Sequence, residues 1–108
     1  MSAIAPAGHL ALTREVHEFA GDHGLLPFLP ALAEATEQVF ADAGRLTAEV
    51  HNDPDVSDLR WIIFRAEVAW TDPARVRAAR DEWYSRTAAA CPGPLLAHVG
   101  LDIDRRPE

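Results

Sequence analysis

The amino-acid sequence predicts a two-layer α+β domain with the element order ααββαβ, in which helices pack mainly on one face of a small three-stranded sheet. Two alternating runs of apolar and polar residues flank a loop rich in Asp, Asn, Ser and Pro between residues 45 and 70. Helical apolar spacings precede this hairpin, and a further helical pattern and a third alternating run follow it. The 108 residues suit one domain, which we place at residues 11–104, with short tails at 1–10 and 105–108.

Two short helices are expected before the hairpin. The first covers residues 11–20, whose apolar side chains recur at i, i+4, i+7 and i+8 and are followed by glycines. The second should begin near Pro30, since proline is tolerated in the first turn of a helix, and should end before Gly44. The apolar stripes of these two helices are formed by Leu12, Val16, Phe19 and Ala20, and by Leu32, Ala35, Val39, Phe40 and Ala43.

The two strands of the hairpin each have an apolar face that should point into the core. In the first strand, residues 45–51, this face is formed by Leu46, Ala48 and Val50, and the residues between them are polar. The second strand covers residues 59–70. Its predicted core face is formed by Ile62, Phe64, Ala66, Val68 and Trp70.

The opposite face of the second strand is also apolar where the strand begins. Leu59, Trp61 and Ile63 lie there at every second position, before the face turns polar at Arg65 and Glu67. If helices cover only the other face, these residues form an exposed apolar patch, which often marks a partner surface. We therefore predict a protein interface at Leu59, Trp61 and Ile63, with Arg65 as a charged anchor beside them. The alternative is that the first helix or a second layer covers this face.

A third helix and a third strand should complete the domain. Thr71 or Asp72 is expected to cap the helix, with Pro73 at its first position, and Pro92-Gly93-Pro94 should end it. Residues 95–104 alternate again, which predicts a strand. After a helical crossover, this strand should lie parallel to the second strand through a right-handed connection.

Charge and cysteine content restrict the partners and the compartment. The formal net charge is −7, and all ten basic residues are arginine. An acidic chain is a poor candidate for binding nucleic acids or anionic membranes, both of which require clustered basic residues. The first residues lack the basic region and apolar run of a signal peptide, and the single cysteine, Cys91, cannot form an internal disulfide. We therefore expect a cytoplasmic protein.

The hairpin loop has the beginning of a calcium-loop pattern. Asp53, Asp55 and Ser57 have the spacing of the first ligands of an EF-hand. However, Asp58 stands where that loop requires glycine, and Phe64 stands where it requires a bidentate glutamate. We interpret this loop as a turn whose polar side chains cap its own backbone.

No motif supports catalysis or the binding of a cofactor. The patterns GxSxG, GxxxxGK[ST] and GxGxxG are absent from the sequence. We therefore predict no catalytic residue, cofactor or metal site. His51, Asp53 and His98 are the residues at which an unexpected metal site or a small His/Asp active site would be sought, provided that their strands are adjacent.

Over residues 28–104, the chain resembles a group of small, uncharacterised prokaryotic α+β proteins. The resemblance rests on EATEQVF (34–40), DPD (53–55, where the group has a DPE-type loop), LRWIIFRAEVAW (59–70), RVRAARDEWYSRTAAACP (75–92) and LLAHVGLDID (95–104). Members of this group are often encoded beside a small helical protein of HEPN type, which implies a toxin–antitoxin-like or other two-component module. The chain lacks the Arg/His pair of a HEPN ribonuclease and the Gly-Ser turn of a minimal nucleotidyltransferase, so the resemblance implies an acidic, non-catalytic partner.

Two functional hypotheses follow from the sequence. The first is a small non-enzymatic protein-interaction module, the antitoxin-like or accessory partner of a two-component system, which binds a protein partner or forms a homo-oligomer. The alternative is a small His/Asp-based hydrolase or a ligand- or metal-binding domain.

Overall fold

The computed structural model describes residues 10–56 and 59–105 and confirms the α+β fold with the predicted order of helices and strands. The helices are α1 (Arg14–Asp22), α2 (Leu29–Val39), α3 (Pro73–Ala90) and the single turn α4 (Gly93–Leu96), with a short 3-10 helix, η1 (Leu26–Phe28), before α2. The strands are β1 (Arg45–Asn52), β2 (Arg60–Val68) and β3 (Val99–Arg105). Residues 1–9 and 106–108 of the expected tails lie outside the described residues.

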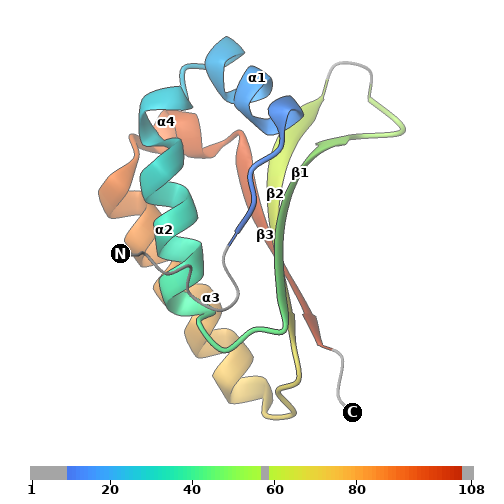
Figure 1. The fold of residues 1–108 in the computed structure, drawn as a ribbon, viewed down its shortest axis with the longest axis vertical. Helices are drawn as coiled ribbons and strands as arrows, with labels where there is room; N and C mark the ends of the chain where they lie inside the picture. Colours follow the sequence, from blue (N-terminus) through green and yellow to red (C-terminus); the bar gives the residue numbers. More distant parts are fainter. Residues whose placement is uncertain (1–9, 57–58, 106–108) are drawn as a thin grey trace.

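The three strands form one sheet in the order β1-β2-β3. β1 and β2 form the antiparallel hairpin, in which Val50 lies opposite Ile62. β3 lies parallel to β2, with Val99 opposite Ile62, so the predicted parallel arrangement is confirmed. Figure 1 shows the sheet nearly edge-on, with all the helices on one side of it.

The boundaries of the first two helices differ from the predicted ones. α1 begins at Arg14 rather than at residue 11, because the Thr13 side chain accepts a hydrogen bond from the Val16 N–H at 3.2 Å and caps the helix. α2 begins one residue before Pro30 but ends at Val39, so Gly44 does not terminate it. The Gly44 N–H instead donates to the Glu67 carbonyl oxygen at 2.9 Å, which places Gly44 at the beginning of the hairpin.

The core lies between β2 and the helical layer. Ile62, Phe64, Ala66 and Val68 are each at most 1% exposed, and Trp70 is also buried, as the alternation predicts. Facing them, α3 contributes Trp83, whose indole N–H donates to the Thr36 hydroxyl of α2 at 2.8 Å. The Thr36 hydroxyl in turn donates to the Leu32 carbonyl oxygen at 2.9 Å. These hydrogen bonds satisfy the polar atoms that α2 and α3 bury against each other.

The segment between α3 and β3 corrects one prediction. Asp72 caps α3 by accepting a hydrogen bond from the Ala74 N–H at 2.9 Å, and α3 ends at Ala90, before the Pro-Gly-Pro sequence, as expected. The predicted strand at 95–104 is wrong at its beginning, because residues 93–96 form the helical turn α4 and β3 begins only at Val99. Pro94 favours this turn, since proline is well placed in the first turn of a helix.

The residues before α1 lie along the outer edge of β1. Ala11 forms an isolated parallel bridge with Thr47, and the Leu10 N–H donates to a Glu37 carboxylate oxygen at 2.8 Å. Leu10, which we expected in the N-terminal tail, is therefore attached to the domain. Within the described part of the chain, no helix combines the length and apolar character needed to cross a membrane.

Candidate functional site

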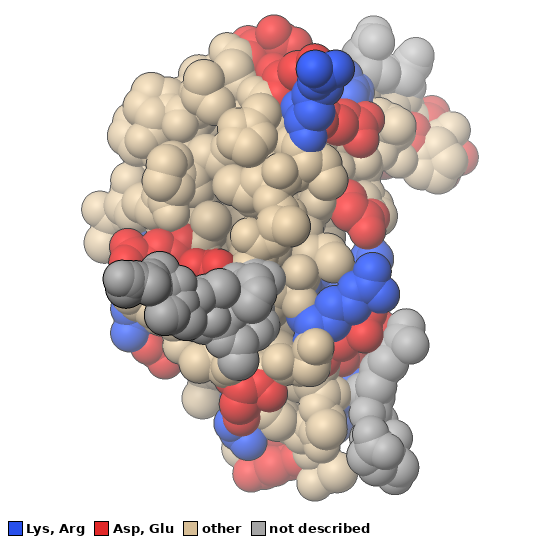
Figure 2. All heavy atoms as spheres, in the orientation of Figure 1, with Lys and Arg blue, Asp and Glu red and all other residues tan. Residues whose placement is uncertain are grey.

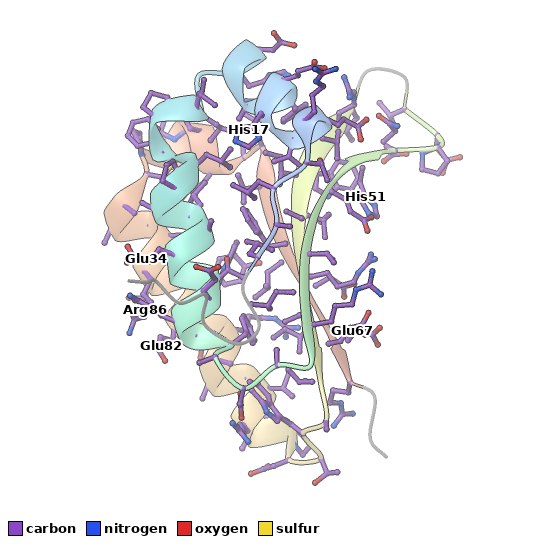
Figure 3. The ribbon with its side chains drawn as sticks, viewed as in Figure 1. His17, Glu34, His51, Glu67, Glu82 and Arg86 are labelled. Carbon is purple, nitrogen blue, oxygen red and sulfur yellow. The ribbon has the colours of Figure 1, made fainter. Side chains whose placement is uncertain are left out.

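The face of the sheet opposite the helices is the candidate site, and we call it the open face. No helix lies on this side of the sheet in Figure 1, and Figure 3 shows His51 and Glu67 pointing away from the helical layer. Strand alternation and register place the following residues on it: Arg45, Thr47, Glu49 and His51 of β1; Trp61, Ile63, Arg65 and Glu67 of β2; and Gly100, Asp102 and Asp104 of β3.

One end of the open face is apolar. Trp61 and Ile63 are half-buried because their side chains lie over Gly100 of the neighbouring strand. A Cβ at Gly100 would lie 3.0 Å from Ile63 Cδ1 and 3.6 Å from Trp61 Cδ1, so the absence of a side chain there allows both residues to lie close to the sheet. Leu59, immediately before β2, is 46% exposed. Among the described residues, no helix covers these side chains, so the three apolar residues predicted for an interface form an accessible surface.

The middle of the open face is held by ion pairs that span all three strands. The Arg65 Nε donates to Asp102 Oδ2 on β3 at 2.9 Å, and Arg65 Nη1 lies 3.7 Å from Glu49 Oε2 on β1. The hydrogen bond to Asp102 raises the pKa of the Arg65 guanidinium; burial opposes this rise, and the Glu49 carboxylate adds to it. Arg65, which we predicted as an anchor for a partner, is therefore already engaged by two carboxylates of its own chain.

Replacing Arg65 with methionine should leave the fold intact. The ion pairs are partly exposed to solvent, and such pairs contribute about 0.2–1 kcal/mol each. We expect the free energy of unfolding, measured by urea denaturation, to fall by about 1 kcal/mol or less in low salt. The difference from the wild-type protein should shrink as salt is added. A loss of several kcal/mol would show that Arg65 is essential to the sheet itself.

The hairpin loop uses its first carboxylate to cap its own backbone. Asp53 Oδ1 accepts hydrogen bonds from the N–H groups of Asp55 at 2.7 Å and Val56 at 3.2 Å. This geometry agrees with the interpretation of the loop as a self-capping turn. Ser57 and Asp58, which belong to the same EF-hand comparison, lie outside the described residues.

The structure does not bring together the residues of the alternative His/Asp site. β2 lies between β1, which carries His51, and β3, which His98 precedes, so the two histidines belong to non-adjacent strands. His51 Nε2 lies 3.2 Å from Glu49 Oε1. In the described residues, no three His, Cys, Asp or Glu side chains are grouped as a metal site would require.

His98 belongs instead to an aromatic cluster that we did not predict from the sequence. Its ring centroid lies 4.7 Å from that of His23, and the His23 ring lies 4.1 Å from that of Phe19. The cluster joins the end of α1 to the segment before β3. Because His23 and His98 are far apart in the sequence, no local pattern indicates their contact.

Cys91 lies buried directly after α3. Its N–H donates to the Thr87 carbonyl oxygen at 3.0 Å, and burial raises the pKa of its thiol. A reactive cysteine needs the opposite shift, because the thiolate is the nucleophile. Cys91 is thus a packing residue at the end of the helix.

No protein-family model, curated protein or solved structure matches this chain. The resemblance to small prokaryotic proteins therefore rests on the sequence motifs alone, and the geometry of the open face carries the functional argument.

Proposed function

We propose that this protein is a small non-enzymatic interaction module that binds a protein partner through the open face. The observation that supports this proposal is the apolar surface formed by Leu59, Trp61 and Ile63 on a side of the sheet where no described helix lies. Tryptophan is enriched among the residues that dominate binding energy at protein interfaces. An accessible tryptophan and isoleucine beside charged residues match the usual apolar centre and polar rim of such interfaces.

Charge indicates what kind of partner would fit. On the open face, the carboxylates of Glu49, Glu67, Asp102 and Asp104 outnumber the guanidinium groups of Arg45 and Arg65. Figure 2 shows acidic and basic side chains close together along the sheet side of the molecule. The partner should therefore present apolar side chains to Trp61 and Ile63 and basic groups to the acidic part of this face, and the net charge of −7 should accelerate its association. In this proposal, the protein would be the acidic, antitoxin-like or accessory partner of a two-component system.

The test compares aspartate substitutions on the two sides of the molecule. A partner retained by the immobilised protein from the native host would be identified and purified, and its affinity for each variant would be measured by titration. Trp61→Asp should weaken binding about 30-fold or more, the loss of 2 kcal/mol or more that defines a dominant interface residue. Leu59→Asp should weaken binding less, because Leu59 lies at the end of the patch.

Leu26→Asp is the matched control. Leu26 lies in η1 on the helical side and is 47% exposed, against 46% for Leu59, so the two substitutions place the same charge at equally exposed leucines. The control should bind as the wild-type protein does, and the circular dichroism spectra and melting temperatures should show that all variants are folded. If a folded Trp61→Asp variant binds the partner with unchanged affinity, the open face is not the binding surface.

A further inference from the structure

We propose that the protein forms a two-fold symmetric dimer in which the outer edge of β3 pairs antiparallel with β3 of a second copy. The two sheets would then join into one sheet of six strands, three from each copy, with the helices of both copies on the same side. This assignment concerns a different surface from the open face and does not depend on the proposed function.

The two edges of the sheet differ in how they are occupied. At the outer edge of β1, the segment before α1 forms the Ala11–Thr47 bridge. At the outer edge of β3, no strand pairs within residues 10–56 and 59–105. An edge strand that presents its backbone groups to solvent is a template for pairing with another chain.

The hydrogen-bond pattern shows which residues of β3 face outward. The Ile62 N–H donates to the His98 carbonyl oxygen at 2.8 Å. Because parallel pairing alternates along a strand, His98, Gly100 and Asp102 direct their backbone groups towards β2. Val99, Leu101 and Ile103 direct theirs towards solvent, and these are the groups that a second β3 would pair.

The side chains of the same residues are incompletely covered on the helical side. Val99, Leu101 and Ile103 are only half-buried, whereas their neighbours on β2 are fully buried. A second copy related by a two-fold axis perpendicular to the sheet would place its own β3 beside them and its own helices over them. The dimer would thus complete the apolar layer that the sheet edge leaves partly open.

α3 offers a further apolar contact at this edge. Arg86 Nη1 donates to Gln38 of α2 at 2.6 Å, so Arg86 lies on the side of α3 that faces α2. Helical geometry puts Tyr84 on the opposite side of α3 from Arg86, since the two flank the buried Trp83. Tyr84 is 49% exposed, and α3 contacts β3 as well as α2, so we infer that Tyr84 lies on the β3 side of α3.

Charge and strand length together select one register for the paired strands. An axis at Ile103 would set Asp102 against Asp104, and an axis at Gly100 would pair only residues 99–101 of β3. If Asp102 lay at the two-fold axis, it would face its own copy, and Val99 would face Arg105. If Leu101 lies at the axis, it faces Leu101 of the second copy, and Val99 faces Ile103 of the second copy. The backbone groups of all three residues point outward, so they can form the hydrogen bonds between the copies. Asp102 then faces Gly100, and directly opposed like charges are avoided.

One segment at this edge carries no charged side chain. A chain with a net charge of −7 repels its own copies, so a stable dimer requires a contact with little net charge. Residues 87–101, which include the end of α3, α4 and the beginning of β3, contain no Asp, Glu, Lys or Arg. The nearest carboxylate on β3, that of Asp102, is neutralised by Arg65.

The test uses the self-opposed position of Leu101. The molar mass of the wild-type protein would be measured by sedimentation equilibrium over a concentration series and should approach twice the chain mass. Leu101→Lys and Leu101→Glu should each halve this mass, since like charges would face each other at the axis. When the two variants are mixed, a lysine faces a glutamate, and the dimer mass should return. This rescue also shows that both variants are folded.

Leu59→Lys is the control. Leu59 is exposed immediately before β2, and its carbonyl oxygen accepts a hydrogen bond from the Asp53 N–H across the hairpin, so it does not belong to the β3 edge; the dimer of this variant should be unaffected. A wild-type protein that stays monomeric throughout the series would overturn the proposal. So would single Leu101 variants that remain dimeric, or folded variants that fail to associate when mixed. Both Leu101 variants keep the open face unaltered, so the partner-binding titration can be repeated on them. Loss of the dimer with unchanged partner binding, or the reverse, then distinguishes failure of the dimer proposal from failure of the proposed function.

Discussion

Replacing Trp83 with alanine should lower the free energy of unfolding by about 3–5 kcal/mol, the range typical of large aromatic residues removed from a core. Trp83 is 1% exposed, and its ring centroid lies 6.1 Å from that of Phe64 on the central strand. Its indole N–H also provides the hydrogen bond to Thr36 that links α3 to α2. The substitution therefore removes the side chain that joins both helices to the sheet and leaves a cavity between the two layers.

The matched control is Trp61→Ala, which removes the same side chain from the open face. Trp61 is half-buried and packs only over one side of the sheet, so its loss should cost about 1 kcal/mol, as is usual for positions outside the core. Urea denaturation followed by circular dichroism would give both values, at a protein concentration held constant between variants. Equal losses at the two positions would contradict the assignment of Trp83 to the core and Trp61 to an accessible face.

The hairpin was the part of the fold most fully predictable from the sequence. In β2, each residue contributes to a face by alternation, so the buried row and the opposite row containing Trp61, Ile63 and Arg65 follow directly from their positions. Helix ends were less predictable, because they depend on capping contacts such as that of Thr13. Leu95 and Leu96 of α4 were assigned to the strand, since a short apolar run does not distinguish one helical turn from an extended segment.

The candidate site was only partly predictable, for a different physical reason. The apolar residues of β2 are local in sequence, but Gly100 and Asp102 join them through the register between β2 and β3, which the sequence does not specify. An isolated glycine within an alternating run often marks a close approach of neighbouring groups, and Gly100 carries that signal. The pairing of Arg65 with Asp102 has no such local signal. Only the folded chain shows that Arg65, the predicted anchor, is already hydrogen-bonded to a carboxylate of its own chain.

Enlarging Ala66 to leucine should destabilise the protein by about 1–3 kcal/mol, because a close-packed core accommodates additional carbon atoms only by displacing its neighbours. Ala66 is 0% exposed on the central strand, between Leu46 of β1 and Ile103 of β3. Both sides of Ala66 are therefore occupied by larger apolar residues, and the helical layer lies over it. Its small side chain leaves little room between the sheet and the helices.

Ala69→Leu provides the comparison, since Ala69 lies just beyond β2 and is exposed. The same enlargement there should change the free energy of unfolding by about 0.5 kcal/mol or less. The urea midpoint should fall for Ala66→Leu while the dependence of the free energy on urea stays the same, because the surface exposed on unfolding is nearly unchanged. Equal stability of Ala66→Leu and Ala69→Leu would mean that there is free space between β2 and the helices. That result would contradict the close packing of the Ile62–Val68 row against the helical layer.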